Sequence, residues 1–222
     1  MAILGITNRT ENWKTARTFA PLFEYRSAWL ARRLLPHRER ARIQPGDTHL
    51  ELFWCGLRDH LHPEGNKLHD EAATLANIYS SLFGDLGKRV MGFEAGSATF
   101  KAPEGSYDIS REGGPSKLAS NLRHTEIDIV VESPSHLFIG EAKHESRLGA
   151  DGKDFLTHQL IRQYVMACVL LNLRGESRTV VPFVVGKKRN DLRRTLQVQF
   201  MIEQKWMREE NVLEWSDIEA LW

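Results

Sequence analysis

The sequence of 222 residues has little cysteine, no long apolar run and a net charge of only +1. Its two cysteines, Cys55 and Cys168, exclude a disulfide-stapled fold. Each lies in an apolar run, so we expect reduced core residues and a cytoplasmic protein. No apolar stretch approaches the roughly 18 residues of a transmembrane helix, so we expect no membrane association. The chain also lacks a Walker loop, a GxGxxG fingerprint and a GxSxG elbow, which are motifs of nucleotide-binding proteins and serine hydrolases.

The low net charge conceals charge that is segregated along the chain. Residues 1–45 hold nine Lys and Arg against three acids, whereas residues 46–85 hold two against seven. A second basic run lies near residue 190. Two basic stretches on a neutral protein suit a polyanion, although each also fits a solvated helix face or a charged loop. The candidate nucleic-acid contacts are Arg32, Arg33, Lys187, Lys188, Arg189, Arg193 and Arg194.

Hydrophobic periodicity and turn residues predict a mixed order of helices and strands. We expect Pro21 near a helix start or break and Ser216 as the cap of a short last helix. Tyr25 and Trp29 could pack in the core or stack on bases, and we favour the core. Pro182 suggests a bulge or an edge in its strand, and residues 200–206 fit a strand or a helix. The expected helices are residues 16–35, 48–61, 67–84 and 154–173. The expected strands are residues 89–93, 125–132, 137–145 and 179–186.

The strands over 125–132 and 137–145 form a predicted hairpin whose register can be worked out. A two-residue turn and a four-residue turn around residues 134 and 135 give the same pairing, which sets Asp128 opposite Glu141. Glu141 and Lys143 are two residues apart in a strand and therefore share one face.

Two opposed carboxylates in apolar strands repel each other and are costly to bury without a cation. Mg²⁺ or Mn²⁺ prefers such oxygen ligands, and the Ala142 carbonyl offers another. Lys143 would then orient a water nucleophile or stabilise charge on a phosphate. The alternative is a solvated hairpin face with a simple Glu141–Lys143 pair.

With Asp128 followed by Glu141-Ala142-Lys143, the sequence resembles the PD-(D/E)xK nuclease superfamily over about residues 67–186. One departure is Ile127, which stands where the family name has proline. The resemblance implies an α/β fold with a restriction-endonuclease-like core of helix, three-stranded antiparallel-containing sheet, helix and strand, behind a helical N-terminal segment. We expect residues 1–46 to form that basic segment, packed on a nuclease-like domain of residues 47–222.

Three further side chains are candidates for the same site. Glu71 falls on the apolar stripe of its predicted helix, where it would be a metal ligand or a first-turn complement to the helix dipole. Gln159 and Gln163 share one helical face, and the resemblance implies that a glutamine there positions substrate or the lysine. A polar helix margin is the alternative for both.

We therefore expect a Mg²⁺- or Mn²⁺-dependent nuclease that hydrolyses nucleic acid, most readily DNA. Double-strand cutting with one site per chain would favour a homodimer. The competing hypotheses are a catalytically inactive nucleic-acid-binding or protein-interaction module on the same fold, and a different metal-dependent hydrolase that uses the same carboxylates.

Overall fold

A computed structural model describes residues 2–3, 6–7, 10–23, 26–61, 99–102, 105–108, 120–144, 148 and 158–221. The chain divides into two compact units. Unit 1 comprises residues 1–54, 127–148 and 181–222, and unit 2 comprises residues 55–126 and 149–180. The predictions for the helix over 67–84, the strand over 89–93 and the site residue Glu71 lie outside the described residues.

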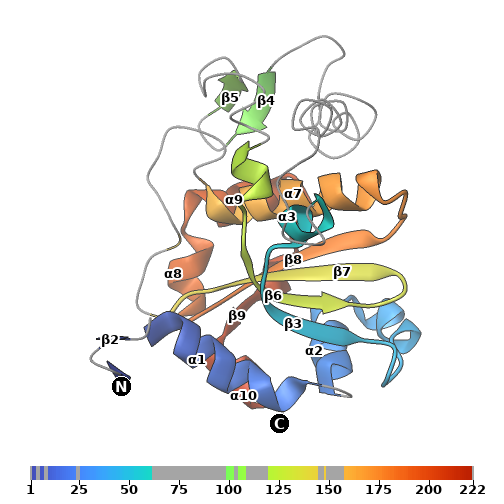
Figure 1. The fold of residues 1–222 in the computed structure, drawn as a ribbon, viewed down its shortest axis with the longest axis vertical. Helices are drawn as coiled ribbons and strands as arrows, with labels where there is room; N and C mark the ends of the chain where they lie inside the picture. Colours follow the sequence, from blue (N-terminus) through green and yellow to red (C-terminus); the bar gives the residue numbers. More distant parts are fainter. Residues whose placement is uncertain are drawn as a thin grey trace. The chain divides into compact units, whose positions relative to one another are not determined.

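A five-stranded mixed sheet confirms the expected α/β class (Figure 1). Its order is β3-β6-β7-β8-β9, in which β3, β6 and β7 are successively antiparallel and β8 is parallel to β9. The strands are β3 (His49–Trp54), β6 (Ile127–Glu132), β7 (His136–Ala142), β8 (Thr179–Gly186) and β9 (Val212–Glu214). Two-stranded sheets are formed by β1 (Ala2–Ile3) with β2 (Ile6–Thr7), and by β4 (Thr99–Ala102) with β5 (Gly105–Asp108).

The β6–β7 hairpin has the predicted register. Glu132 pairs with Leu137 and Ile129 pairs with Gly140. The turn is closed by Ser133, whose backbone N–H donates to the His136 carbonyl at 2.9 Å and whose Oγ accepts the His136 N–H at 3.0 Å. Both strands are mostly buried, so the apolar run of β7 sits inside the protein as a strand covered on both faces does.

The structure of residues 48–61 differs from one prediction. We expected a helix over residues 48–61, but residues 49–54 form β3, and only α3 (Gly56–Leu61) is helical. Leu50 and Leu52 pair with Val131 and Ile129 of β6. This pairing gives the backbone of residues 49–54 partners in a sheet, and tertiary contacts of this kind commonly override local helical periodicity.

The core of unit 1 joins one face of the sheet to helices from both ends of the chain. Phe19, Leu30 and Leu34 from the N-terminal helices are fully buried in one cluster with Phe138 and Ile218. Burying side chains of this size contributes about 1.5–3 kcal/mol each. The helices are α1 (Thr10–Phe19), the 3₁₀ turn η1 (Ala20–Leu22), α2 (Ser27–Leu34) and the 3₁₀ segment η3 (His37–Arg42). The predicted break at Pro21 is thus confirmed.

Of the two placements considered for Trp29, the favoured one in the core is wrong: its side chain is 42% exposed. The buried face of α2 is formed instead by its small and aliphatic residues, so the indole points to solvent. Tyr25, the other aromatic expected in the core, lies outside the described residues.

The C-terminal part of unit 1 is helical around the short strand β9. It contains α8 (Arg189–Arg193), α9 (Leu196–Glu203), the 3₁₀ turn η6 (Glu209–Asn211) and α10 (Trp215–Glu219). Residues 200–203 are therefore helical. Glu214, not Ser216, caps α10, since Glu214 and Asp217 form a reciprocal capping box. Lys14 Nζ lies 2.8 Å from Glu219 Oε1, which ties α1 to α10.

Unit 2 contains α3, α7 (Gln159–Leu173) and the β4–β5 sheet. α7 confirms the predicted helix from residue 159 onward. Cys55 and Cys168 are free and buried, as predicted, and burial raises the pKa of Cys168 to about 12. Among the described residues, no helix has both the length and the apolar character needed to cross a bilayer.

Gly140 shows why one position in β7 must be glycine. A Cβ at this position would overlap the ring of Phe183, which is fully buried in β8. The aromatic ring thus occupies the space beside the backbone directly before Glu141. The glycine allows β8 to approach β7 closely at the point where the candidate site begins.

Gly140→Ala is expected to destabilise the protein by about 1–3 kcal/mol, because the packed ring must shift. Urea unfolding measures the change. A cycle with Phe183→Leu provides the control, since the alanine should cost less once the ring is smaller. An equal cost in both backgrounds would contradict the overlap.

His136 gives the fold a specific pH dependence. Burial lowers its pKa, although Glu39, 3.9 Å away, opposes the shift. The folded state therefore favours neutral imidazole, and stability is lost as the pH falls from about 6.5, the unfolded value, through the lower folded value. His136→Gln should remove this component of the acid destabilisation. Urea unfolding between about pH 7.5 and pH 5 tests it, with exposed His37→Gln as the control. An unchanged pH slope in His136→Gln would refute the assignment.

Candidate active site

The candidate site in unit 1 is built around a buried ion pair at the end of β7. Glu141 is completely buried, and its Oε1 lies 2.6 Å from Lys143 Nζ. The Lys143 side chain is only 11% exposed. The prediction that the two residues share a face is confirmed. The alternative expected a Glu141–Lys143 pair on a solvated face: the pair is present, but it is buried. A buried carboxylate beside an ammonium is costly to desolvate, so such pairs are kept where their chemistry is used or their geometry is strongly held.

Asp128 lies on the neighbouring strand and reaches the same point of β7. Its Oδ2 accepts a hydrogen bond of 2.9 Å from the Ala142 backbone N–H. The observed pairing of the two strands extends as far as Ile129 and Gly140, the pair next to Asp128 and Glu141. The carboxyl group of Asp128 and the Glu141–Lys143 pair thus lie together around the end of β7.

The backbone of Lys143 is held from two sides. Its N–H donates to the Val185 carbonyl at 2.8 Å, so the C-terminal ends of β7 and β8 lie side by side. Its carbonyl accepts a bond of 3.3 Å from Trp215 Nε1. Trp215 is 7% exposed and packs edge-on to Phe19 and His144.

Trp215 is a residue that the sequence pattern did not single out. It lies 72 positions from Lys143 along the chain, and only the packing of α10 brings the two together. Its place at the start of a short final helix offered no local signal of this role. The indole fixes where the lysine leaves the strand.

The ligand set fits a hard divalent cation in chemical type. Asp128 and Glu141 offer carboxylate oxygens, and the Ala142 carbonyl lies between Glu141 and Lys143. Within the described part of the chain, no group of three or more His, Cys, Asp or Glu side chains forms a metal-binding cluster. The third predicted carboxylate, Glu71, is outside that part.

The predicted glutamines belong to unit 2. Gln163 is fully buried on α7, and its Nε2 donates to the Glu126 carbonyl at 3.0 Å. Gln159 starts the same helix and is partly exposed. The hydrogen bond shows that Gln163 holds the chain just before β6, and a role of either residue at the active site stays a prediction.

The predicted nucleic-acid contacts fall into two kinds. Some arginines are engaged within the protein: Arg32 Nε donates to the Ile43 carbonyl at 2.9 Å, Arg189 pairs with Asp217 at 2.6 Å, and Arg193 pairs with Glu209 at 3.0 Å. Arg33 is partly buried. The exposed members are Lys187, Lys188 and Arg194. Both lysines follow directly after β8, whose end adjoins Lys143.

Asp217 shows how firmly the engaged arginines are held. Burial alone would raise the pKa of its carboxyl, but the Glu214 N–H at 2.7 Å and the Arg189 guanidinium outweigh that effect, so the pKa is lowered. Arg189 also donates through Nε to the Val212 carbonyl at 3.0 Å. These bonds make Arg189 a brace between α8 and the β9–α10 segment.

Comparisons with protein-family models, with curated proteins and with solved structures found no match in any of the three.

Trp215→Phe is expected to destabilise the protein by about 1 kcal/mol, because the packing is kept but the Lys143 carbonyl loses its donor. Urea unfolding measures the effect, and Trp29→Phe makes the same chemical change at an exposed position. Equal stabilities of the two variants would show that the indole bond contributes nothing.

Proposed function

We propose that this protein is a metal-dependent nuclease of the PD-(D/E)xK type, with a restriction-endonuclease-like core and DNA as its preferred substrate. The observation that carries the proposal is the buried Glu141–Lys143 pair, with the Asp128 carboxylate bonded to the backbone between them. A charged group enclosed in apolar strands beside a second carboxylate is expensive unless the site uses it.

In this proposal Asp128 and Glu141, with the Ala142 carbonyl, hold Mg²⁺ or Mn²⁺. A bound ion of this kind supplies a water of lowered pKa and neutralises charge on the phosphate oxygens. The Ala142 N–H keeps one oxygen of Asp128 in place, so the carboxylate is oriented before any ligand arrives. Glu71 is the proposed third carboxylate.

Lys143 has the role of positioning the attacking water and stabilising the phosphorane-like charge. Its ammonium is fixed by Glu141, and its backbone is fixed by Val185 and Trp215. The water oxygen forms the new bond to phosphorus, the bond to the departing sugar oxygen breaks, and that oxygen takes up a proton. Gln159 and Gln163 are proposed to position substrate or the lysine.

The exposed Lys187 and Lys188 support a phosphodiester substrate. They extend from the end of β8, which is hydrogen-bonded to Lys143. Two cations at this place would attract a phosphate backbone toward the carboxylates, and their contribution would weaken with salt. A homodimer would supply a second site for the opposite strand of a duplex.

The test is cleavage of labelled single-stranded DNA, duplex DNA and RNA with Mg²⁺, Mn²⁺ or EDTA. We expect metal-dependent cleavage that falls at least about 100-fold in Asp128→Asn, because a positioned catalytic group contributes that much. Asp59→Asn, at an exposed aspartate of unit 2, is the matched control.

Lys143→Met alone leaves a buried charge unpaired, which costs about 3–5 kcal/mol and threatens folding. The double variant Glu141→Gln/Lys143→Met removes both charges together and keeps similar shapes. Cleavage that survives in this folded variant would refute the site. Nucleic-acid binding with no cleavage of any substrate would favour the non-catalytic module instead.

A further inference from the structure

The N-terminal helical segment exposes three aromatic side chains that the core does not use: one on α1, one directly after η1 and one on α2. Trp13 is 50% exposed, Phe23 43% and Trp29 42%. Arg17 and Arg26 are exposed between them in the chain. We name these five residues, Trp13, Arg17, Phe23, Arg26 and Trp29, the aromatic–arginine stripe. Arg26 and Trp29 are in contact, and exposed aromatics that gather in a patch mark interaction surfaces.

Helical phase explains why the stripe faces outward. On α1, Thr15, Thr18 and Phe19 are buried, so Trp13 and Arg17, one turn apart, occupy the opposite side. On α2 the buried positions are Ser27, Ala28, Leu30, Ala31 and Leu34. Trp29 and the preceding Arg26 lie away from that face. The two helices therefore turn their aromatic and basic residues to solvent while packing their other sides on the core.

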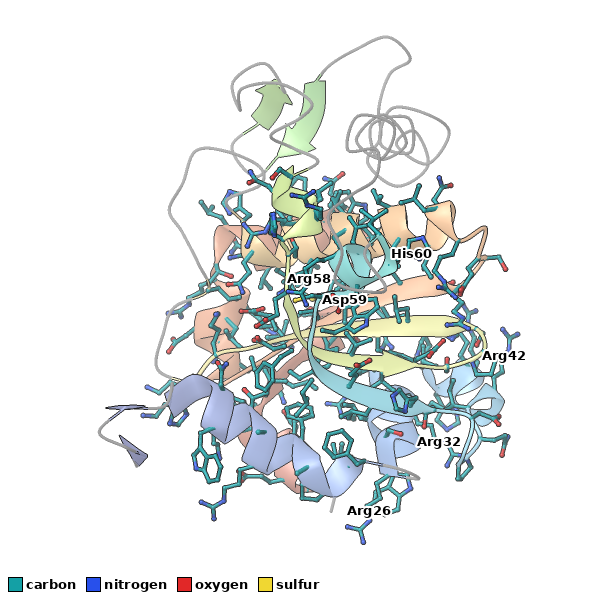
Figure 2. All side chains as sticks on the ribbon, in the orientation of Figure 1. Arg26, Arg32, Arg42, Arg58, Asp59 and His60 are labelled. Atoms are coloured by element: carbon teal, nitrogen blue, oxygen red, sulfur yellow. The ribbon has the colours of Figure 1, made fainter. Side chains whose placement is uncertain are left out.

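Arg26 is arranged to strengthen the stripe. Its guanidinium carbon lies 5.6 Å from the centroid of the Trp29 ring, a cation–π distance. Figure 2 shows Arg26 reaching away from the ribbon. The pair places a flat aromatic ring beside a positive charge. A nucleotide can stack its base on such a ring while its phosphate binds the charge.

The positive charge of this surface indicates which kind of partner it binds. Residues 13–33 contain five Lys and Arg and one acid. Lys14 pairs with Glu219 and Arg32 with the Ile43 carbonyl, and the exposed bases are Arg17 and Arg26. A second copy of the same surface would bring arginine against arginine, which is unfavourable. A duplex keeps its base faces stacked inside, whereas a single strand exposes both base faces and phosphates.

We propose that the aromatic–arginine stripe binds single-stranded nucleic acid, with bases stacked on Trp13, Phe23 and Trp29 and phosphates held by Arg17 and Arg26. The stripe is a binding surface in its own right and does not depend on hydrolysis. It adds to the proposed nuclease a means of holding unpaired strands.

The test is fluorescence anisotropy of a labelled 20-nucleotide oligo-dT and of a duplex of equal length, with EDTA present so that metal-dependent cleavage cannot occur. We expect oligo-dT to bind more tightly than the duplex. Trp13→Ala and Trp29→Ala should each weaken oligo-dT binding about 5- to 100-fold, as loss of one stacked base does. Trp29→Phe should retain most of the affinity. Leu196→Ala, at an apolar side chain of α9 that is 57% exposed, is the control and should change nothing.

Salt separates the two kinds of contact. Arg17→Ala/Arg26→Ala should reduce the slope of log affinity against log salt by about 1.4, because each single-strand phosphate contact contributes about 0.7. The tryptophan variants should keep the slope.

Absence of oligo-dT binding, or binding that Trp13→Ala/Trp29→Ala leaves unchanged, would overturn the proposal. If Trp13→Ala/Trp29→Ala changed only self-association, measured by sedimentation, the stripe would be a contact between two copies of the chain. That result would also overturn the proposal. These outcomes are separate from the nuclease test. Oligo-dT binding without cleavage supports the stripe while contradicting hydrolysis, and Asp59→Asn, at an exposed aspartate, should bind oligo-dT as the wild type does.

Discussion

The ion pair between Glu141 and Lys143 is the constraint around which unit 1 is arranged. A fully buried carboxylate demands a cation within hydrogen-bonding distance, and the lysine can provide it only if β7 ends where it does. That end is set by neighbours on each side. Asp128 binds the Ala142 N–H, and Val185 accepts the Lys143 N–H. The close approach of Phe183 at Gly140 holds β8 against β7 immediately before the pair.

The parts of the site that the sequence predicted are the parts that depend on local rules. A strand repeats every two residues, and a short turn fixes the pairing of its two strands. From these rules the register of β6 and β7 and the shared face of Glu141 and Lys143 could be predicted, and both were confirmed. The same rules gave a wrong prediction for residues 49–54, which form a strand and not a helix. Their apolar residues stand at spacings that suit a helix as well as a strand. Only their pairing with β6 decides between the two.

The side chains that sequence reasoning placed wrongly, or did not notice, are those whose roles depend on distant packing. Trp29 and Trp215 are both tryptophans in short helices, yet one is exposed beside Arg26 and the other is buried against Lys143. A count of charged residues along the sequence likewise does not show which charges are bound within the protein. Arg26 and Arg189 each add one positive charge to a basic stretch of the sequence, but Arg189 binds Asp217 and the Val212 carbonyl, whereas Arg26 is exposed to solvent.

The contacts of Trp215 also constrain the order in which the protein can be assembled. The ring of Trp215 has Lys14 5.4 Å above it, and its indole nitrogen binds the Lys143 carbonyl. Residues that are far apart along the chain thus meet at one side chain. Contacts between such distant residues form slowly, because long loops must close first. A nascent chain that has passed β7 therefore still lacks the support that fixes its lysine, and acquires it only after residue 215 has been synthesised and α10 has docked.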